Sequence, residues 1–364
     1  MEVMTKSVKV GNVQIGGGAP VSIQSMCNTR TADVKASLEQ IRRLEDAGCE
    51  IIRLTVPDIE SAKALKEIKM KSNIPVVADI HFDYKMAIAS MEAGADKIRI
   101  NPGNIGSDEN VKKVVDMAKK CHVPIRVGVN SGSLEKDILA KYGKVTAEGL
   151  AESALRNTQL LEKFDFDDIV ISLKSSNVKI NYDAYKIVAK ATDHPLHIGV
   201  TEAGTPSRGK VKSAAGVGAL LLEGIGDTMR ISLTADPVEE VVFAKALLES
   251  LGLRTSNVEI VSCPTCGRTE VDLESIASQV ERNIDKIDSK MKALGIPEDK
   301  GIKIAVMGCA VNGPGEAKGA DIGVACGKGE GLLFAGGQIV KKVKEESIVS
   351  ELMLLADKYI ESLR

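Results

Sequence analysis

Eight short apolar runs, each followed by an amphipathic segment, constrain the fold of this chain more than any other feature of its sequence. The segments between the runs carry apolar residues three and four positions apart, which predicts helices, for example at 35–47 and 59–70. Glycines at the joints, such as Gly48 and Gly94, favour a left-handed helix end that returns the chain to a sheet. The predicted strands are Pro20–Met26, Ile51–Val56, Pro75–Ile80, Lys97–Asn101, Pro124–Val129, Asp168–Leu173, Pro195–Val200 and Thr228–Leu233.

Eight strands that alternate with helices predict an α/β fold in which a parallel sheet closes into a (β/α)8 TIM-type barrel. An open, doubly wound sheet is the alternative. A helix at 238–251 and a polar joint at 252–257 follow the last strand, so we expect the barrel domain to cover residues 1–252.

Residues 253–364 do not continue the regular alternation of strand and helix, and their pattern predicts a small α+β domain. The expected elements are strands at 258–261, 302–307, 321–325 and 331–334, a long helix at 273–294 and a terminal helix at 346–363.

Composition excludes several classes of protein. Only 3% of the 364 residues are aromatic, none is Trp, and the formal net charge is −2, which argues against a surface that stacks or attracts nucleic acid. No apolar run is long enough to span a membrane, and residues 1–13 lack a signal-peptide core. Seven cysteines, an odd number, are typical of reduced thiols, so we expect a cytoplasmic protein.

Polar residues stand where the predicted strands end, which is where barrels carry their active sites. For any one of these residues a salt bridge inside the barrel would be an ordinary explanation. Convergence of several cations on one rim is different, because like charges repel unless an anionic guest joins them. Guanidinium groups match phosphoryl oxygens, so the sequence predicts a small phosphorylated ligand. The five cations are Arg53, Arg99, Arg126, Lys174 and Arg230, with Asn130, Glu202 and Ser232 close to them in the sequence.

A phosphate-loop pattern at 204–210, GTPSRGK, is followed by Val211, so the hydroxyl that binds Mg²⁺ is missing. An NTPase phosphate-binding loop is the alternative interpretation, and the missing hydroxyl disfavours it. We expect a plain loop that leads into a helix at 213–223.

Three cysteines on glycine- and proline-rich turns indicate a metal or iron–sulfur site. Cys263 and Cys266 form a C-x-x-C turn, and Cys309 precedes Glu316 by seven residues. Structural zinc would need a fourth ligand, for which Cys326 is the candidate, and a redox dithiol would not explain Cys309. A cluster held by the three cysteines, with Glu316 as a labile oxygen ligand, fits better. The remaining thiols, Cys27, Cys49 and Cys121, are expected to be small buried side chains.

These motifs resemble the 4-hydroxy-3-methylbut-2-enyl diphosphate synthase family, iron–sulfur enzymes of the non-mevalonate isoprenoid pathway. The resemblance rests on SCPTCGRT and MGCAVNGPGEAKGADIG, and in the barrel on PVSIQSMCNT, VADIHF, IRINPGNIG, GVNSGSLE, SLKSS, HIGVTEAGT and GIGDTMRISL. It covers nearly the whole chain and matches the two-domain bacterial form.

The resemblance implies an oxidoreductase that opens 2-C-methyl-D-erythritol 2,4-cyclodiphosphate reductively, with loss of water, to 4-hydroxy-3-methylbut-2-enyl diphosphate. It implies a [4Fe-4S] cluster on three cysteines and Glu316, Glu202 as an acid, and Asn312 beside the cluster. It implies substrate binding by the five rim cations with Asn130 and Ser232. Family members are homodimers in which the cluster domain of one chain closes over the partner's barrel, and reduced flavodoxin or ferredoxin supplies the electrons.

Two other interpretations stay open at this point. A phosphate-substrate barrel enzyme with a zinc-stabilised tail would be colourless and active without a reductant. A non-catalytic iron–sulfur carrier would leave the cations at the strand ends without a role.

Overall fold

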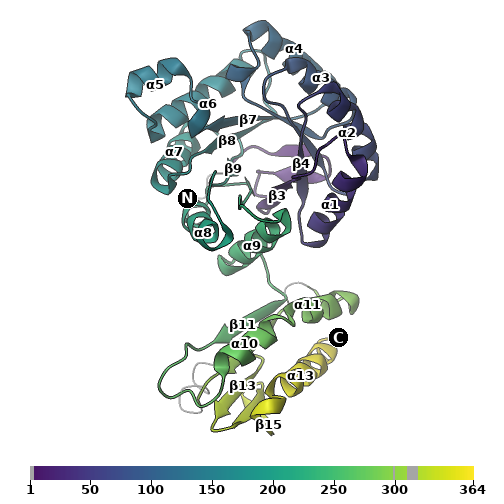
Figure 1. Cartoon of the computed structure of the whole chain (residues 1–364), viewed down its shortest axis with the longest axis vertical. Coiled ribbons are helices and arrows are strands. Elements are labelled where there is room, and N and C mark those ends of the chain that lie inside the picture. Colours follow the sequence, from purple (N-terminus) through teal and green to yellow (C-terminus); the bar gives the residue numbers. More distant parts are fainter. Residues whose placement is uncertain (1–3, 298–299, 310–318) are drawn as a thin grey trace. The chain divides into compact units, whose positions relative to one another are not determined.

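The computed structural model describes residues 4–297, 300–309 and 319–364, and the chain divides into two compact units, Met1–Arg254 and Thr255–Arg364. Figure 1 shows the helix-ringed sheet of the first unit and the smaller sheet of the second.

The first unit contains an eight-stranded sheet in the order β8-β7-β6-β5-β4-β3-β10-β9. All seven pairings are parallel, and a bridge between Ile171 and Leu196 links β8 to the start of β9. This closure confirms the barrel over the open sheet. The strands are β3 Ser22–Met26, β4 Ile51–Thr55, β5 Val76–Asp79, β6 Lys97–Ile100, β7 Ile125–Asn130, β8 Ile169–Lys174, β9 His197–Ile198 and β10 Thr228–Met229.

The helices between the strands form the outer ring (Figure 1). Side-chain oxygens cap several helix starts, as Asp33 does for α1 and Asp58 for α2, and the apolar faces are buried, as Leu38, Ile41 and Leu44 are in α1. The ring consists of α1 Val34–Asp46, α2 Ile59–Lys71, α3 Tyr84–Glu92, α4 Asp108–Cys121, α6 Ala147–Glu162, α7 Val178–Ala191, α8 Pro206–Leu222 and α9 Pro237–Ser250.

Some parts of the barrel unit differ from the expectation. A hairpin of β1 Val8–Val10 and β2 Val13–Ile15 packs against Ile51, Val77 and Val170, near the amino ends of the strands. An additional helix, α5 Lys136–Tyr142, precedes α6, and short 3-10 turns occur at Pro102–Asn104 and Ser131–Ser133.

The predicted start of the helix at 213 was wrong. Helix α8 begins at Pro206, so most of the GTPSRGK stretch is helical. Proline is favoured at the first position of a helix, because its ring already fixes φ near the helical value. The N–H that proline lacks would have no partner within the helix at that position.

The second unit is a five-stranded sheet in the order β11-β12-β13-β14-β15, which confirms the predicted α+β class. The first three strands are parallel and the last two antiparallel. Its elements are β11 Val258–Ser262, β12 Ile302–Met307, β13 Ile322–Gly327, β14 Glu330–Ala335, β15 Gln338–Lys344, α10 Leu273–Glu281, α11 Ile284–Ala293, a 3-10 turn Glu345–Ser347 and α13 Ile348–Ser362.

The long helix predicted at 273–294 is two helices, because α10 ends at Glu281 and α11 starts at Ile284. Asn283 lies at the break, where its side-chain amide donates to the carbonyl of Gln279 at 2.8 Å. Such side-chain bonds compete with the helical hydrogen bonds of the backbone.

Among the helices of the described ranges, none has both the length and the apolar character that crossing a bilayer requires.

Candidate active site

Six cationic side chains lie within the barrel. Side chains alternate along a strand, so residues two apart, such as Lys97 and Arg99, share the inner face. Lys97 and Arg126 are 0% and 1% exposed, which places them deepest. The six are Arg53 of β4, Lys97 and Arg99 of β6, Arg126 of β7, Lys174 at the end of β8 and Arg230 directly after β10.

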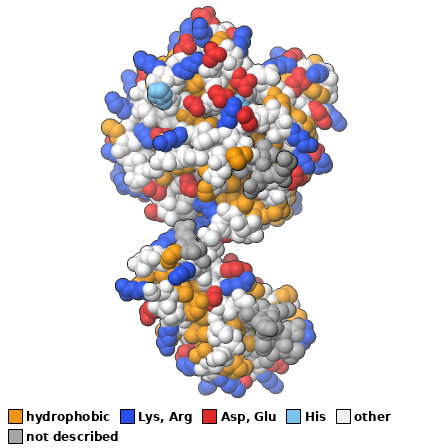
Figure 2. All heavy atoms as spheres, turned by 180° about the vertical axis from the view of Figure 1, so that it is seen from behind, with side chains coloured by type: hydrophobic (Ala, Val, Ile, Leu, Met, Phe, Trp, Pro, Cys, Tyr) orange, Lys and Arg blue, Asp and Glu red, His pale blue; other side chains and the backbone are white. Residues whose placement is uncertain are grey.

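The five cations predicted at the rim are therefore brought together, since Arg53, Arg99, Arg126 and Arg230 all act electrostatically on Lys174. Figure 2 shows Lys, Arg, Asp and Glu side chains interspersed over one face of the molecule. The concentration of positive charge is internal, where a barrel of this type normally packs branched apolar side chains.

Asp79, the last residue of β5, is the buried carboxylate that faces these cations. Its carboxylate oxygens lie 3.1 Å from Arg99 Nη1 and 3.6 Å from Arg53 Nε. Burial alone would raise the pKa of Asp79, but the positive charges around it outweigh burial and lower that pKa to about 2. A second carboxylate, Glu240 of α9, is 3.3 Å from Arg230 Nη2. Burial raises the pKa of Glu240, and Arg230 opposes that rise.

Two glycines make room for cations. The Nη2 of Arg99 donates to the carbonyl oxygen of Gly128 at 3.1 Å, and a Cβ at position 128 would lie 2.2 Å from Arg99 Nε. At Gly199 a Cβ would lie 3.0 Å from Lys174 Nζ. Lys174 Nζ also lies 3.4 Å from Nε2 of the buried His197.

Several buried donors of this group have no hydrogen-bond partner among the described residues. They are Nε and Nη1 of Arg126, Nε of Arg230 and Nζ of Lys97, and both the amide nitrogen and the amide oxygen of the buried Gln24 also lack a partner there. Burial lowers the pKa of Lys97, Arg126 and Lys174, and the neighbouring cations lower it further. Unpartnered buried cations are costly, and an anion has the acceptors that these donors lack.

Three further predicted residues lie near the carboxyl ends of the strands. Asn130 ends β7 opposite Lys174 in the sheet register, and both Asn130 and Ser232 are half-buried. Glu202 is exposed in the loop after β9 and has a φ of 51°, a left-handed conformation that is uncommon for residues other than glycine. Such a conformation persists only where the surrounding structure holds it.

The cysteine turns meet at one edge of the second sheet. Cys263 and Cys309 follow β11 and β12, which are neighbouring parallel strands, so both thiols lie beyond the same ends. The backbone N–H of Gly308 donates to Cys263 Sγ at 3.1 Å. The turn that carries Cys266 packs here as well, because a Cβ on Gly308 would lie 3.2 Å from the side chain of Thr269.

The protonation of these thiols differs with their surroundings. Hydrogen bonds from the Arg268 backbone and side chain lower the pKa of Cys266, which favours a thiolate. Cys326 is 0% exposed in the core, and burial raises its pKa to about 12. The burial of Cys326 argues against a role as ligand. Asn312 and Glu316 lie outside the described residues.

The described cysteines do not form a site for a single ion, since no three of their sulfurs all lie within 4.8 Å of one another. All seven thiols of the chain are free.

One compact group of possible metal ligands does occur in the described residues, formed by Glu162, Asp167 and His194. Lys6 already pairs with Asp167 at 2.8 Å, and His194 Nε2 lies 3.0 Å from Glu162. These contacts account for the group as an ion-pair network.

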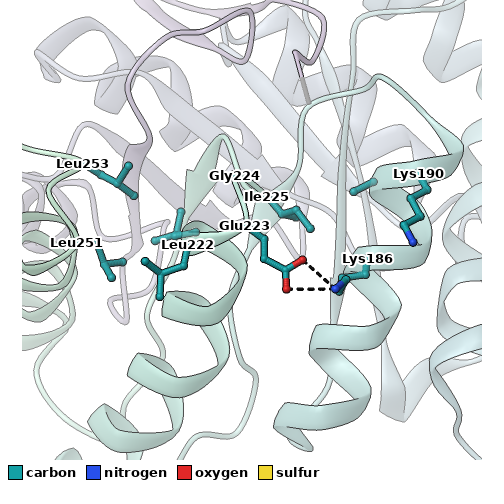
Figure 3. A pocket seen from close by; sticks show the side chains of 10 residues that line it. Lys186, Lys190, Leu222, Glu223, Gly224, Ile225, Leu251 and Leu253 are labelled. Atoms are coloured by element: carbon teal, nitrogen blue, oxygen red, sulfur yellow. Dashed lines mark hydrogen bonds and ion pairs between the residues drawn. The ribbon is translucent and has the colours of Figure 1, made fainter. Parts of the chain in front are cut away.

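A hollow of about 670 Å³ lies where α7 and α8 end, away from the cationic end of the barrel (Figure 3). Leu222, Ile225 and Leu253 line it, and Lys186 is paired with Glu223 at 2.9 Å. Its main polar contact is thus internal to the protein, in contrast to the unpaired donors inside the barrel.

The prediction from sequence left out Lys97, Glu240 and the two glycines as parts of the site. Lys97 had a signal, because it precedes Arg99 by two residues in the same strand. Glu240 lies within a helix and carried no such signal.

Both units of the chain match known proteins. A family model described as the GcpE TIM-barrel domain matches residues 5–245, and one described as the GcpE protein C-terminal domain matches residues 259–358. A Fusobacterium nucleatum protein named 4-hydroxy-3-methylbut-2-en-1-yl diphosphate synthase (flavodoxin) is 55% identical over 362 residues, covering 100% of this chain and 99% of that protein. A protein of the same name from Caldicellulosiruptor saccharolyticus is 58% identical over 350 residues, covering 96% and 97%.

Among solved structures, N-acetylneuraminic acid synthetase from Leptospira borgpetersenii, in complex with citrate, matches with 14% identity and a TM-score of 0.49. That match covers 68% of this chain and 91% of the other, and a likeness at this level says nothing about chemistry. The two family models together span both units of the fold, and the relatives match over almost their full length. The chain therefore belongs to the GcpE family.

Proposed function

We propose that this protein is a 4-hydroxy-3-methylbut-2-enyl diphosphate synthase. It would open 2-C-methyl-D-erythritol 2,4-cyclodiphosphate reductively, using two electrons, and release the cleaved oxygen as water. The observation that carries the proposal is the excess of cations inside the barrel, five buried and Arg230 half-buried, against the two carboxylates Asp79 and Glu240, with guanidinium donors that lack partners. Relatives that are 55% identical over the whole chain bear the name of this activity.

The diphosphate is proposed to bind at the cationic end of the barrel. Arg53, Arg99, Arg126, Lys174 and Arg230 would hold its oxygens, and Asn130 and Ser232 would donate to its edges. A diphosphate supplies the acceptors that these donors lack, so binding would relieve the cost of burying them. Because the charged part stays anchored while the ring opens, the reacting carbons keep their position.

Three observations support an iron–sulfur cluster at the cysteine edge: Cys263 and Cys309 follow neighbouring parallel strands, an N–H is donated to Cys263, and the pKa of Cys266 is lowered. Cys263, Cys266, Cys309 and Glu316 are the proposed ligands of a [4Fe-4S] cluster, with Asn312 beside it. When bound, such a cluster supplies single electrons at low potential and an iron with an exchangeable ligand. Glu202 is proposed to give a proton to the departing oxygen.

We also propose a homodimer in which the cysteine unit of one copy serves the barrel of the other. Arg254, the last residue of the barrel unit, donates to the carbonyl of Val21 and pairs with Glu50. Val21 and Glu50 directly precede β3 and β4. The chain thus leaves the barrel at the amino ends of its strands, whereas Lys174 and Arg230 lie at or just beyond the carboxyl ends, which supports service in trans.

The proposed electron donor is reduced flavodoxin or ferredoxin, since the relatives are named for flavodoxin. We propose a cytoplasmic setting, in keeping with seven free thiols.

Anaerobic turnover tests the function. The purified protein, reduced flavodoxin and the cyclodiphosphate should yield the open-chain diphosphate, and omission of the reductant should abolish product. An active colourless protein that needs no reductant would favour the zinc-stabilised barrel enzyme. An iron–sulfur protein that neither turns over nor binds the cyclodiphosphate would be a carrier.

A further inference from the structure

Met26 contacts two of the barrel arginines through its sulfur. It is the last residue of β3, the strand between β4 and β10, and stands opposite Arg53 in the register. Its Sδ lies 2.7 Å from Nη2 and 3.2 Å from Nε of Arg53, and 3.6 Å from Nη1 of Arg230. A single thioether thus accepts from the guanidinium group of Arg53 in β4 and from that of Arg230, directly after β10.

Each arginine is held on a second side by a carboxylate. Asp79 lies 3.6 Å from Arg53 Nε, and Glu240 lies 3.3 Å from Arg230 Nη2. Glu240 is itself fixed, because its Oε1 accepts from the backbone N–H of Leu233 at 2.8 Å. The side chains form a continuous series in the order Asp79, Arg53, Met26, Arg230 and Glu240.

The chemistry of sulfur suits the middle of this series. A carboxylate at position 26 would neutralise both arginines and compete with an anionic ligand. A hydrocarbon would offer no acceptor, so the two guanidinium groups would repel each other without a common anchor. A thioether is a neutral, weak acceptor, which orients the guanidinium groups and leaves their charge available.

We propose that Met26 is a positioning residue that holds Arg53 and Arg230 as a preformed pair for the diphosphate of the substrate, an inference that rests on the proposed function. Donors remain for the ligand, since Nε of Arg230 is buried without a partner among the described residues. By holding the two guanidinium groups before the anion arrives, Met26 reduces the side-chain freedom that binding would otherwise remove.

Calorimetric titration of the anaerobically purified protein with inorganic pyrophosphate tests this role. Met26→Leu keeps the bulk and removes the acceptor, and Met26→Gln restores an acceptor of similar reach. Met229→Leu is the matched control, because Met229 is 0% exposed next to Arg230 and packs in the core shared by the strands and helices. Thermal melts establish that each variant is folded.

We expect Met26→Leu to raise the Kd for pyrophosphate roughly five-fold, the effect of losing about one hydrogen bond of ordinary strength, because a thioether is a weak acceptor. The KM for the cyclodiphosphate should rise by a similar factor with kcat within about two-fold, because the contact orients binding groups and not the reacting atoms. Met26→Gln should recover most of the affinity, and Met229→Leu should bind like the wild type.

The titrations distinguish the role of Met26 from the proposed diphosphate site. If the wild type does not bind pyrophosphate, both the proposed diphosphate site and the role of Met26 are wrong. If the wild type binds and Met26→Leu binds equally well, only the role of Met26 is overturned. If Met26→Leu and Met26→Gln are equally weak, the sulfur acts by packing, and its role as an acceptor is overturned.

Discussion

Arg99 lies directly across the backbone of Gly128, 3.1 Å from its carbonyl oxygen, in space that any other residue at position 128 would fill. The glycine belongs to β7 and the arginine to β6, so the packing of two neighbouring strands sets the place of this guanidinium group. The contact illustrates how the barrel positions its cations before any ligand arrives.

Gly128→Ala should displace Arg99, because the new methyl group would lie 2.2 Å from Arg99 Nε. We expect about 1–3 kcal/mol of lost stability from overpacking and roughly a ten-fold weaker affinity for pyrophosphate. Gly218→Ala in α8 is the control, since its Cβ would meet only Leu247 at 3.8 Å. Thermal melts and calorimetry measure both effects, and an unchanged affinity in Gly128→Ala would show that Arg99 does not contact the anion.

Arg126→Met should weaken anion binding while it stabilises the ligand-free protein. Arg126 is 1% exposed with two nitrogens unpartnered in the described structure, so its burial carries a desolvation cost without full compensation. We expect a gain of about 1–3 kcal/mol in the free energy of unfolding. Pyrophosphate affinity should fall more than ten-fold, the effect of losing over about 1.4 kcal/mol of binding free energy.

The control for that substitution is Arg156→Met. Arg156 lies on the surface and pairs with Asp137 and Glu152, and it should change stability by less than about 1 kcal/mol and leave binding as it was. A loss of stability in Arg126→Met would mean that the guanidinium group is well compensated even without ligand.

Asp79 should make stability depend on pH in acid. The pKa of Asp79 is about 2 in the folded chain and 3.8 in an ordinary setting, so its ionised form stabilises the fold above about pH 4. That contribution, about 2 kcal/mol, is lost as the pH falls from 4 toward 2. Asp79→Asn should therefore be less stable than the wild type at pH 5, with the difference shrinking toward pH 2. Denaturant unfolding followed by circular dichroism measures this, and a difference independent of pH would contradict it.

Cys326→Ala should keep its iron. The thiol is buried in the core of the second unit, where its loss leaves a small cavity worth about 1 kcal/mol. Iron analysis should match the wild type while the melting temperature falls slightly. Loss of iron from a folded Cys326→Ala protein would make this thiol a ligand.

The barrel was predictable because its signals are local. Most strands are short apolar runs between turn signals, as in β4 and β5, and alternation along β6 and β7 sets Arg99 and Arg126 apart from the apolar residues on either side of each. The hairpin of β1 and β2 was missed because its strands have three residues each and include polar Lys9 and Gln14. Strand β15 was missed for a related reason: five of its first six side chains are exposed, and lysines interrupt its apolar pattern.

The finer architecture of the site depends on contacts between residues far apart in the chain. Met26 meets Arg230 across 204 positions, and this pairing exists only because the barrel closes β3 against β10. The positions of Glu240 and Gly128 likewise follow from packing between elements. Local patterns predict which residues point inward, whereas the partners that hold them emerge from tertiary structure.

The central claim is that the cysteine edge carries a redox cluster that serves a diphosphate-binding barrel. Iron and sulfide analysis with a visible absorption spectrum, on anaerobically purified wild type, Cys309→Ser and the control Cys121→Ser, tests it most directly. The account predicts a brown protein with about four iron and four sulfide per chain, bleached in Cys309→Ser and unchanged in Cys121→Ser. A colourless wild type with stoichiometric zinc would contradict it and leave only a barrel that binds phosphate.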